Sequence, residues 1–327
     1  GRSAGVWCSS DAGVCGAGPP RAAECGERVG PLGQHRVVRT AQRSLRRLLC
    51  LVVAALLRRH PVAPGLHAVR RIERAALGLA PRGGFLEEGF VTLTELPGDL
   101  LTRVGKMRAA FGKVNTLHNH VLSWTDRPLV TQNLVGGEDG IDDAGISVAR
   151  LITNPWLFLE ATGQVFRGDS GTLYKSSQRG DLSYVGHLRG YQDITENSNI
   201  DLGVSYSRGH NDSAAGIPEI TAEAASAYAT QLYGVDATFR WKPLQRAIYH
   251  SFIARTEWVW SRRDQPNGLQ QASGFYLSGD YQAGRRWFTG VRLDRSDRAT
   301  DASLTASGAS FTVTYWPSQF SQVRPPF

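Results

Sequence analysis

Apolar and polar residues alternate along most of the chain from residue 85 onward, a pattern typical of β-strands. In the segment 232–241, one face carries Tyr233, Val235, Ala237, Phe239 and Trp241, and the other carries Gly234, Asp236, Thr238 and Arg240. Segments 275–283, 286–294 and 310–315 show the same period. Because successive side chains of a strand point to opposite faces, each segment would have one apolar and one polar face.

Seven further segments alternate less strictly, namely 85–96, 100–107, 145–152, 156–166, 182–191, 200–208 and 248–260. The pattern therefore predicts about eleven strands, separated by turn-forming clusters. Several strands reach the ~9–11 residues that cross a bilayer when tilted. The Ala-rich segment 214–229 is expected to be helix or loop. We expect an all-β, antiparallel, up-and-down fold.

Two architectures fit these strands. In a soluble sandwich the apolar faces pack inward, whereas in a transmembrane barrel they meet lipid and the polar faces line a lumen. Opposite charges within single strands and long polar loops between strands favour the barrel. So do six aromatic residues near strand ends, as interfacial girdles require: Trp241, Trp258, Trp260, Trp287, Tyr315 and Trp316.

The first 84 residues differ from the rest in composition. They hold 14 Arg and 4 acidic residues, whereas residues 85–327 hold 23 basic and 25 acidic residues, so the net charge of +8 comes from one segment. This distribution argues against a nucleic-acid partner for the whole chain. All four cysteines (Cys8, Cys15, Cys25 and Cys50) also lie there, at spacings that fit no zinc finger. We expect two parts, residues 1–84 and a β-barrel domain 85–327.

Residues 1–84 allow several interpretations. The apolar run 48–57 is too short to span a bilayer and resembles the middle of a signal peptide, but a short buried or surface helix fits it better. The whole segment is poorly structured or helical, or it is a translation in the wrong reading frame of a GC-rich gene. Peptides recovered from 1–84 of the native protein would exclude the last interpretation.

Four stretches carry a resemblance to a known family. They are 104–130 (VGKMRAAFGKVNTLHNHVLSWTDRPLV), 136–150 (GGEDGIDDAGISVAR), 158–171 (FLEATGQVFRGDSG) and 315–324 (YWPSQFSQVR). The chain from about 85 to 324 resembles phosphate-selective porin-like outer-membrane proteins. It is also similar to uncharacterised porin-like barrels, some of which are labelled zinc-regulated outer-membrane receptors.

The resemblance implies a barrel in the outer membrane of a Gram-negative bacterium, in contact with membrane lipid and lipopolysaccharide. Relatives of this kind typically have sixteen strands and are often trimeric. This chain departs from them in its smaller number of strands and in Pro325 and Pro326, which cannot donate ladder hydrogen bonds before the terminal Phe327. An open or incomplete barrel is therefore expected.

Charged side chains on the polar faces are the candidate pore-lining residues: Arg189, Arg240, Arg255, Arg292, Asp236, Glu257 and Asp294. Arginine keeps its charge and binds phosphate or carboxylate in a fork, so a ladder of arginines would attract anions. In the alternative, these arginines pair with Asp236, Glu257 and Asp294 and only satisfy a polar interior.

Three further motifs suggest chemistry. His118 and His120 would share one face of a strand and could bind zinc with Asp126 as a third ligand, although a solvated loop pair also fits. The acidic stretch 136–143 does not match the EF-hand template and is expected to be a surface turn. The tetrapeptide 168–171 (GDSG) matches a serine-protease motif without its partners, and we expect a hairpin turn.

The sequence thus predicts a porin-like channel for passive diffusion of small hydrophilic solutes, with a preference for anions as an open question. No enzymatic step and no cofactor are expected. The alternatives are a TonB-linked receptor for a metal or chelate, which usually needs 22 strands and a plug domain, and a soluble β-sandwich binding protein.

Overall fold

The structure is a computed structural model that describes residues 71–80, 83–214, 217–318 and 321–324, without the side chains of 71–87, 95 and 120. The chain divides into two compact units, Gly1–Arg47 and Leu48–Phe327. The first unit lies outside the described residues, as do the four cysteines, the run 48–57, and Pro325, Pro326 and Phe327. The predictions made for them therefore stay predictions.

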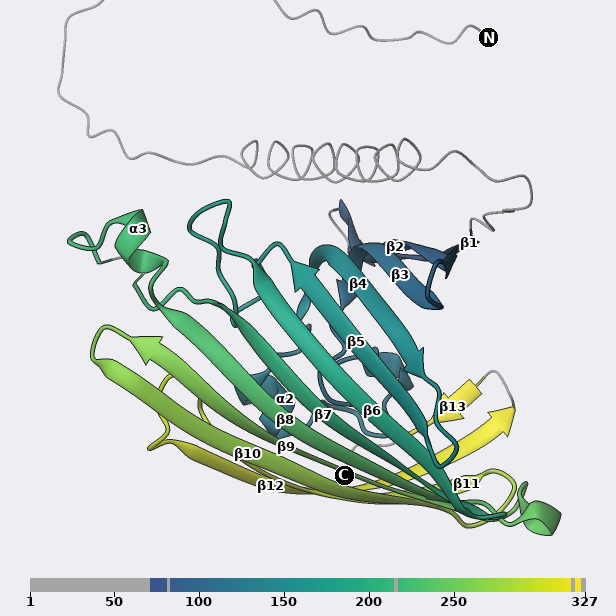
Figure 1. The fold of residues 1–327 in the computed structure, drawn as a ribbon. Coiled ribbons are helices and arrows are strands. Elements are labelled where there is room, and N and C mark those ends of the chain that lie inside the picture. The colour runs from purple at the N-terminus through teal and green to yellow at the C-terminus, as the bar shows by residue number, and fades with distance from the viewer. Residues whose placement is uncertain (1–70, 81–82, 215–216, 319–320, 325–327) are drawn as a thin grey trace, which may run out of the picture. The chain divides into compact units, whose positions relative to one another are not determined.

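One antiparallel sheet contains every described strand, and each strand pairs with the next one in the chain (Figure 1). Its strands are β1 Arg71–Ala80, β2 Gly83–Leu96, β3 Leu100–Arg108, β4 Asp142–Ile152, β5 Phe158–Phe166, β6 Ser183–Thr195, β7 Ser198–His210, β8 Ala229–Trp241, β9 Ser251–Gln265, β10 Gly268–Gln282, β11 Trp287–Asp297, β12 Thr305–Ser318 and β13 Ser321–Val323. Three short helices, η1 Asn119–Val121, α3 Ala222–Ala225 and η2 Leu244–Arg246, lie in connections, and a fourth is described below.

This topology confirms the all-β, up-and-down fold and all eleven predicted segments. It adds β1 and β13, which gives 13 strands, and β1 begins before residue 85, within the Arg-rich segment. Within the described residues β1 and β13 do not pair, so they are the two edges of the sheet. None of the described helices is both long enough and apolar enough to cross a membrane.

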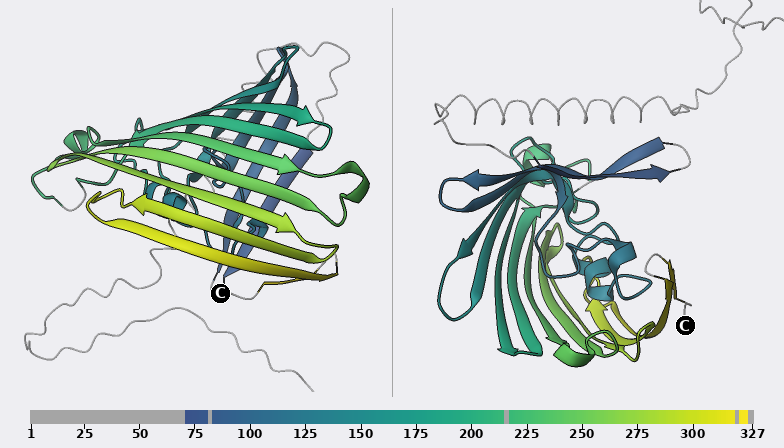
Figure 2. Two further views of the ribbon diagram at one scale, coloured as in Figure 1. Left: turned by 90° about the horizontal axis from the view of Figure 1, so that it is seen from below. Right: turned by 90° about the vertical axis from the view of Figure 1, so that its right-hand side faces the viewer.

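The connection between β3 and β4, residues 109–141, folds back against the concave face of the sheet (Figure 2, right). We call it the inner segment. Its helix α2, Leu129–Leu134, contacts β9, β10, β11 and β12. Its apolar side chains pack with inward-facing residues of the sheet into one buried cluster, which includes Phe111, Val114, Leu122, Trp124, Val130, Leu134, Leu232, Val259 and Tyr276.

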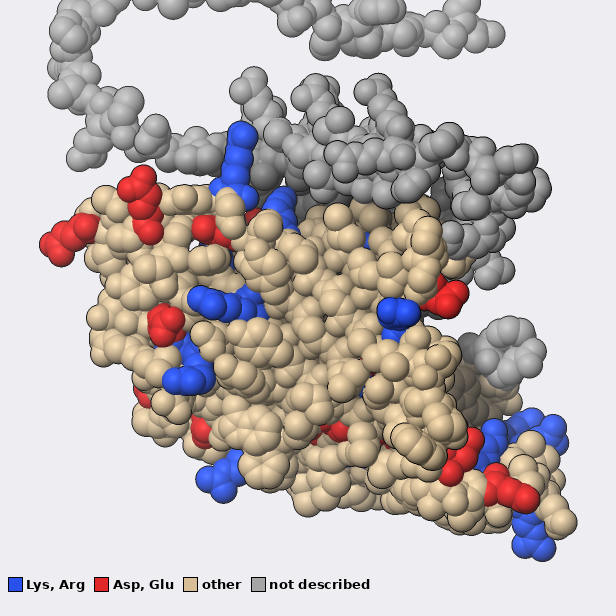
Figure 3. Space-filling view, in the orientation of Figure 1, with Lys and Arg blue, Asp and Glu red and all other residues tan. Residues whose placement is uncertain are grey.

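The two faces of the sheet have opposite polarity, and the polar one is the buried one. In β11, for example, the Val291 side chain on the convex face is 48% exposed, whereas its neighbour Arg292 on the concave face is 2% exposed. The same alternation runs through β7, β8, β9 and β10. In Figure 3 charged side chains lie mainly toward the margins of the convex face. The core of this protein therefore lies inside the curve of the sheet.

Replacing Trp124 by Ala should remove the largest aromatic side chain of the inner segment from this core. Trp124 is 2% exposed, and a Trp→Ala change at such a site costs about 3–5 kcal/mol of unfolding free energy. Denaturant unfolding in detergent measures the cost. The matched control is Trp156→Ala, because Trp156 lies in the β4–β5 turn and is 78% exposed. Equal stability of the two variants would contradict this description of the core.

Candidate functional site

A polar cavity lies between the inner segment and the concave face of β2 to β6. Its volume is about 770 Å³. Strand residues Arg103, Glu160 and Arg189 line it, and the inner segment contributes Lys113 and His118. Because polar side chains from five strands converge on one space, this cavity is the candidate functional site.

Two of its cations are neutralised by one buried carboxylate. Arg189 donates from Nε and Nη2 to the two oxygens of Asp201, at 2.9 and 2.8 Å, and Lys113 Nζ donates to Asp201 Oδ2 at 2.8 Å. Arg240 lies 3.8 Å from the same oxygen and donates to Asn199 at 3.5 Å. Through these contacts Asp201, which is 1% exposed, links the inner segment to β6 and β8.

The opposite wall of the concavity, formed by β8 to β12, is covered by the inner segment. Glu257 is buried and accepts backbone N–H bonds from Lys113 and from Val114, the latter at 2.6 Å. Asp294 accepts the backbone N–H of Leu129 at 3.2 Å. Gly112 has a φ of +58°, and a Cβ there would lie 2.9 Å from Glu257 Oε2, so only glycine allows this close approach.

Two arginines of this wall hold the far part of the inner segment. Arg292 donates to Asp126 Oδ2 at 2.9 Å and to the Asp126 carbonyl at 3.0 Å, and Arg255 donates to Ser123 at 3.3 Å. Both guanidinium groups also lie over the ring of Trp124, at 5.0 Å for Arg292 and 5.9 Å for Arg255. These cation–π contacts fix the indole against the sheet.

The predicted pore-lining residues therefore have two different environments. All seven lie on the concave face as predicted, but only Arg189 lines the open cavity. The inner segment is bound by four others, Arg255, Arg292, Glu257 and Asp294. The strand pattern could not predict the position of that segment.

The alternative, in which the arginines pair with Asp236, Glu257 and Asp294, holds for one arginine. Arg292 pairs with Asp294 at 2.7 Å, but Arg255 pairs with Asp280 instead of Glu257, and Arg240 lies near Asp201 instead of Asp236. Asp236 Oδ2 has no hydrogen-bond partner in the described part of the chain. The prediction failed because alternation fixes the face of a side chain and leaves its neighbours on adjacent strands open.

Arg127 also forms hydrogen bonds within the inner segment that stabilise its conformation. Its Nε donates to Asn119 Oδ1 at 2.7 Å, and its Nη2 donates to the Leu117 carbonyl at 2.6 Å. Burial lowers the pKa of Arg127 to about 10, and the nearby charge of Arg108 acts in the same direction. The guanidinium therefore stays charged at neutral pH, which keeps these bonds charge-assisted.

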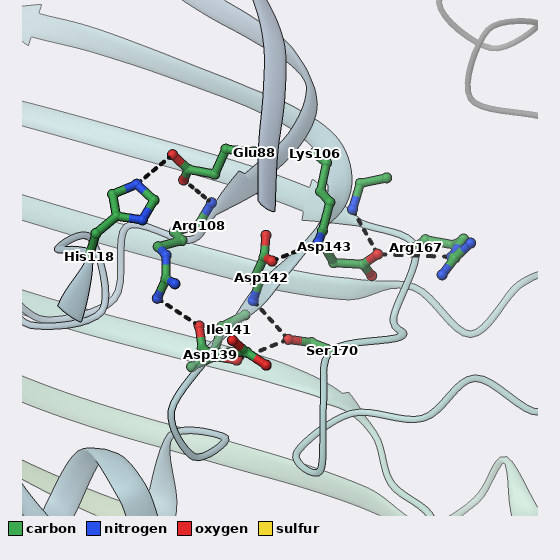
Figure 4. A network of polar contacts seen from close by, with 12 residues as sticks. Glu88, Lys106, Arg108, His118, Asp139, Ile141, Asp142, Asp143, Arg167 and Ser170 are labelled. Carbon is green, nitrogen blue, oxygen red and sulfur yellow. Dashed lines mark hydrogen bonds and ion pairs between the residues drawn. The ribbon is translucent and has the colours of Figure 1, made fainter. Parts of the chain in front are cut away.

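The two ends of the inner segment are tied to the sheet by a polar network (Figure 4). Arg108 donates to the Asp139 carbonyl at 2.9 Å, and Lys106 pairs with Asp142 at 2.9 Å. The backbone N–H of Asp142 donates to Ser170 Oγ at 2.9 Å. The acidic stretch 136–143 and the GDSG tetrapeptide are thus brought together. Ser170 also bridges Tyr174 within the long β5–β6 connection, so GDSG leads into a short turn there and does not form the predicted hairpin turn between two strands.

The predicted metal ligands do not converge. His118 Nε2 contacts Glu88 at 3.0 Å, whereas Asp126 binds Arg292, so Asp126 is not a third ligand beside His118. His120 lies in η1, and its side chain is outside the described set. Among the described residues, no group of three or more His, Cys, Asp or Glu side chains could hold a metal ion.

Comparisons with known proteins give one relative of this chain. An uncharacterized protein of Aquifex aeolicus (strain VF5) is 24% identical over 283 residues, which are 76% of this chain and 58% of that protein. The chain thus spans little more than half the length of this relative. No family model matches the chain, and no solved structure matches it.

Glu257→Ala should loosen the inner segment. The change leaves the N–H groups of Lys113 and Val114 without their acceptor, and each buried unsatisfied group costs about 1–3 kcal/mol. We expect faster amide hydrogen exchange over 112–115 and lower stability. Glu257→Gln retains an acceptor oxygen and should have a smaller effect. Unchanged exchange in Glu257→Ala would show that this carboxylate does not hold the inner segment.

Proposed function

We propose that the chain forms a porin-like channel in a bacterial outer membrane, through which small hydrophilic solutes diffuse passively. One observation carries the proposal: large apolar side chains are exposed on the convex face while charged side chains are buried on the concave face. In water such a sheet would expose far more apolar surface than monomeric soluble proteins do. In lipid the same surface is favourable.

Aromatic side chains lie at two levels of the convex face, as membrane interfaces favour. One level is formed by Tyr184, Tyr206, Tyr233, Trp258, Trp260 and Phe275, and the other by Trp241, Phe252, Tyr281, Trp287 and Tyr315. Trp316 was predicted for this girdle, but it alternates onto the opposite face. Along β8, eight residues separate Tyr233 from Trp241, or about 26 Å of strand. A tilt of about 40° reduces this to roughly 20 Å, close to the ~25 Å apolar band of such barrels.

The apolar band lies between these two levels. It is formed by Leu188, Leu202, Val204, Val235, Leu277, Val291, Leu293 and Phe311, all exposed. Most connections at one end of the strands are short, namely β2–β3, β4–β5, β6–β7 and β10–β11, with β8–β9 longer. The inner segment and the long β5–β6 and β7–β8 loops leave from the other end, where β9–β10 is a tight turn. Outer-membrane barrels place short turns in the periplasm and long loops outside.

The proposed mechanism is diffusion through a polar passage, with no chemical step. The cavity beside the inner segment supplies polar walls lined by Arg103, Arg108, Lys113 and Arg189 against Glu88 and Glu160. Because Lys113 and Arg189 share Asp201, only a small excess of basic side chains remains. This excess supports a modest anion preference. Trimer formation and contact with lipopolysaccharide remain part of the proposal.

The soluble sandwich is less well supported. A sandwich needs a second layer over the apolar face, and no described element packs on the convex face of β6 to β11.

Reconstitution of the full chain into planar bilayers tests the channel. We expect discrete ion currents and a reversal potential that favours anions in a salt gradient. The protein should also require detergent to remain monodisperse. A monodisperse protein without detergent that gives no current would contradict the proposal.

Leu277→Arg tests the membrane placement separately. Leu277 lies within the apolar band of β10 and is 51% exposed. A charge there should reduce stability in a bilayer by about 2–4 kcal/mol, measured by urea unfolding from liposomes. The matched control is Leu304→Arg, because Leu304 is 50% exposed and lies in the β11–β12 loop, beyond the ends of the strands. If both variants lose equal stability, or neither does, the convex face is not in lipid.

A further inference from the structure

We propose that the cavity between the inner segment and β2 to β6 binds small zwitterionic solutes, with Arg103 holding the carboxylate and Glu160 holding the ammonium group. This inference deepens the proposed channel function and depends on it for the transport experiment. It rests on which charged groups of the cavity already have partners in the protein.

Most of the ionic groups that line the cavity are engaged. Lys113 and Arg189 share Asp201, and His118 contacts Glu88 at 3.0 Å. Arg108 donates to the carbonyl of Asp139. Because these groups already have partners within the protein, they bind a passing solute less strongly than unpaired charges do.

Arg103 is the available cation. It lies on β3, opposite Ser147 of β4, and its side chain is exposed to the cavity. Its guanidinium lies 5.4 Å from the centre of the Phe90 ring, and it forms no ion pair with any described acidic residue. The aromatic ring orients the guanidinium without neutralising it, which leaves its fork of donors free for a carboxylate.

Glu160 is the available anion. It lies on β5, directly opposite Arg189 of β6. Arg189 donates from Nε and Nη2 to Asp201, so its charge attracts Glu160 without a hydrogen bond or close ion pair between them. A half-buried carboxylate that accepts no hydrogen bond from the described residues is suited to receive an ammonium group.

The two charges are separated by a neutral floor. Arg103 and Glu160 lie two strands apart and four residues out of register, so their Cα atoms are about 16 Å apart. Ser147, Ala149 and Thr162 lie between them on the same face. Both charged side chains are long and can shorten this gap. The geometry suits a solute whose charges are several ångströms apart and joined by polar groups, such as a short peptide.

The charge pattern also favours a zwitterion over solutes of a single charge. A simple anion near Arg103 is repelled by Glu160, and a simple cation near Glu160 is repelled by Arg103, so each gains less than a zwitterion does, even though the cavity as a whole prefers anions to cations. A zwitterion satisfies both. Each contact is exposed enough to be weak, as passage through a channel requires.

Osmotic swelling of proteoliposomes tests the proposal. Triglycine is the zwitterionic probe, glucose is a neutral probe of similar mass, and succinate and putrescine are the anionic and cationic probes. We expect the wild type to swell several-fold faster in triglycine than in glucose. Arg103→Gln and Glu160→Gln should each bring this ratio close to one. Glu160→Gln should in addition favour succinate, and Arg103→Gln should favour putrescine.

The charge swap is the sharpest variant. Arg103→Glu combined with Glu160→Arg keeps one cation and one anion in the cavity. The preference for triglycine over glucose should therefore return, with the bound peptide lying in the opposite direction. The matched controls are Arg208→Gln on the convex face of β7 and Glu196→Gln in the β6–β7 turn, which should retain the wild-type ratio.

Calorimetric titration of triglycine into the protein in detergent separates the two proposals. No swelling in any solute would contradict the channel, while binding of triglycine that both single variants weaken would still support the site. The site is overturned if the wild type neither binds nor prefers triglycine, if the single variants keep the ratio, or if the charge swap fails to restore it. Circular dichroism spectra that match the wild type exclude misfolding as the cause.

Discussion

The structure depends on one constraint: a single sheet must bury its polar face and leave its apolar face exposed. Every strand from β2 to β12 has a hydrogen-bonded neighbour on both sides, so the backbone needs no water along the convex face. The concave face carries Asp201, Glu257 and Arg292, all almost fully buried. Buried charges are tolerated only with partners. The inner segment provides many of these partners. The polar concave face therefore requires a segment with matching hydrogen-bonding groups to pack against it.

The inner segment fills this space unevenly, and the unevenness produces the site. Against β8 to β12 it forms an apolar cluster with Leu232, Val259 and Tyr276, surrounded by hydrogen bonds to Glu257 and Asp294. Against β2 to β6 it leaves a polar cavity. A backbone that donates N–H bonds to carboxylates on one wall is fixed in place there, so any polar passage lies along the other wall.

The sequence was sufficient to predict the strands and their faces, because the period of two is a local property that tertiary contacts rarely override. It also placed the charged residues on the concave side.

The sequence pattern missed β1, whose Arg- and Ala-rich sequence lacks alternation, and β13, which has only three residues. It could not place residues 109–141 inside the sheet, because no local pattern distinguishes an inward-folded connection from an outer loop. A usable signal was available in Phe111, Val114, Leu122 and Trp124, which are too apolar for a solvated loop. Partners such as Arg255 with Asp280 depend on register between strands, which alternation leaves undetermined.

Two adjacent side chains of β10, compared in a lipid bilayer, test most directly which face of the sheet meets lipid. After the cysteines at 8, 15, 25 and 50 are replaced by serine, Leu277→Cys and Ser278→Cys each receive a spin label. The label at 277 should be accessible to oxygen dissolved in lipid and protected from a water-soluble nickel complex. The label at 278, on the concave face, should be shielded from lipid. Equal accessibility of both labels to the nickel complex, or lipid exposure at 278 only, would show that the convex face does not meet lipid.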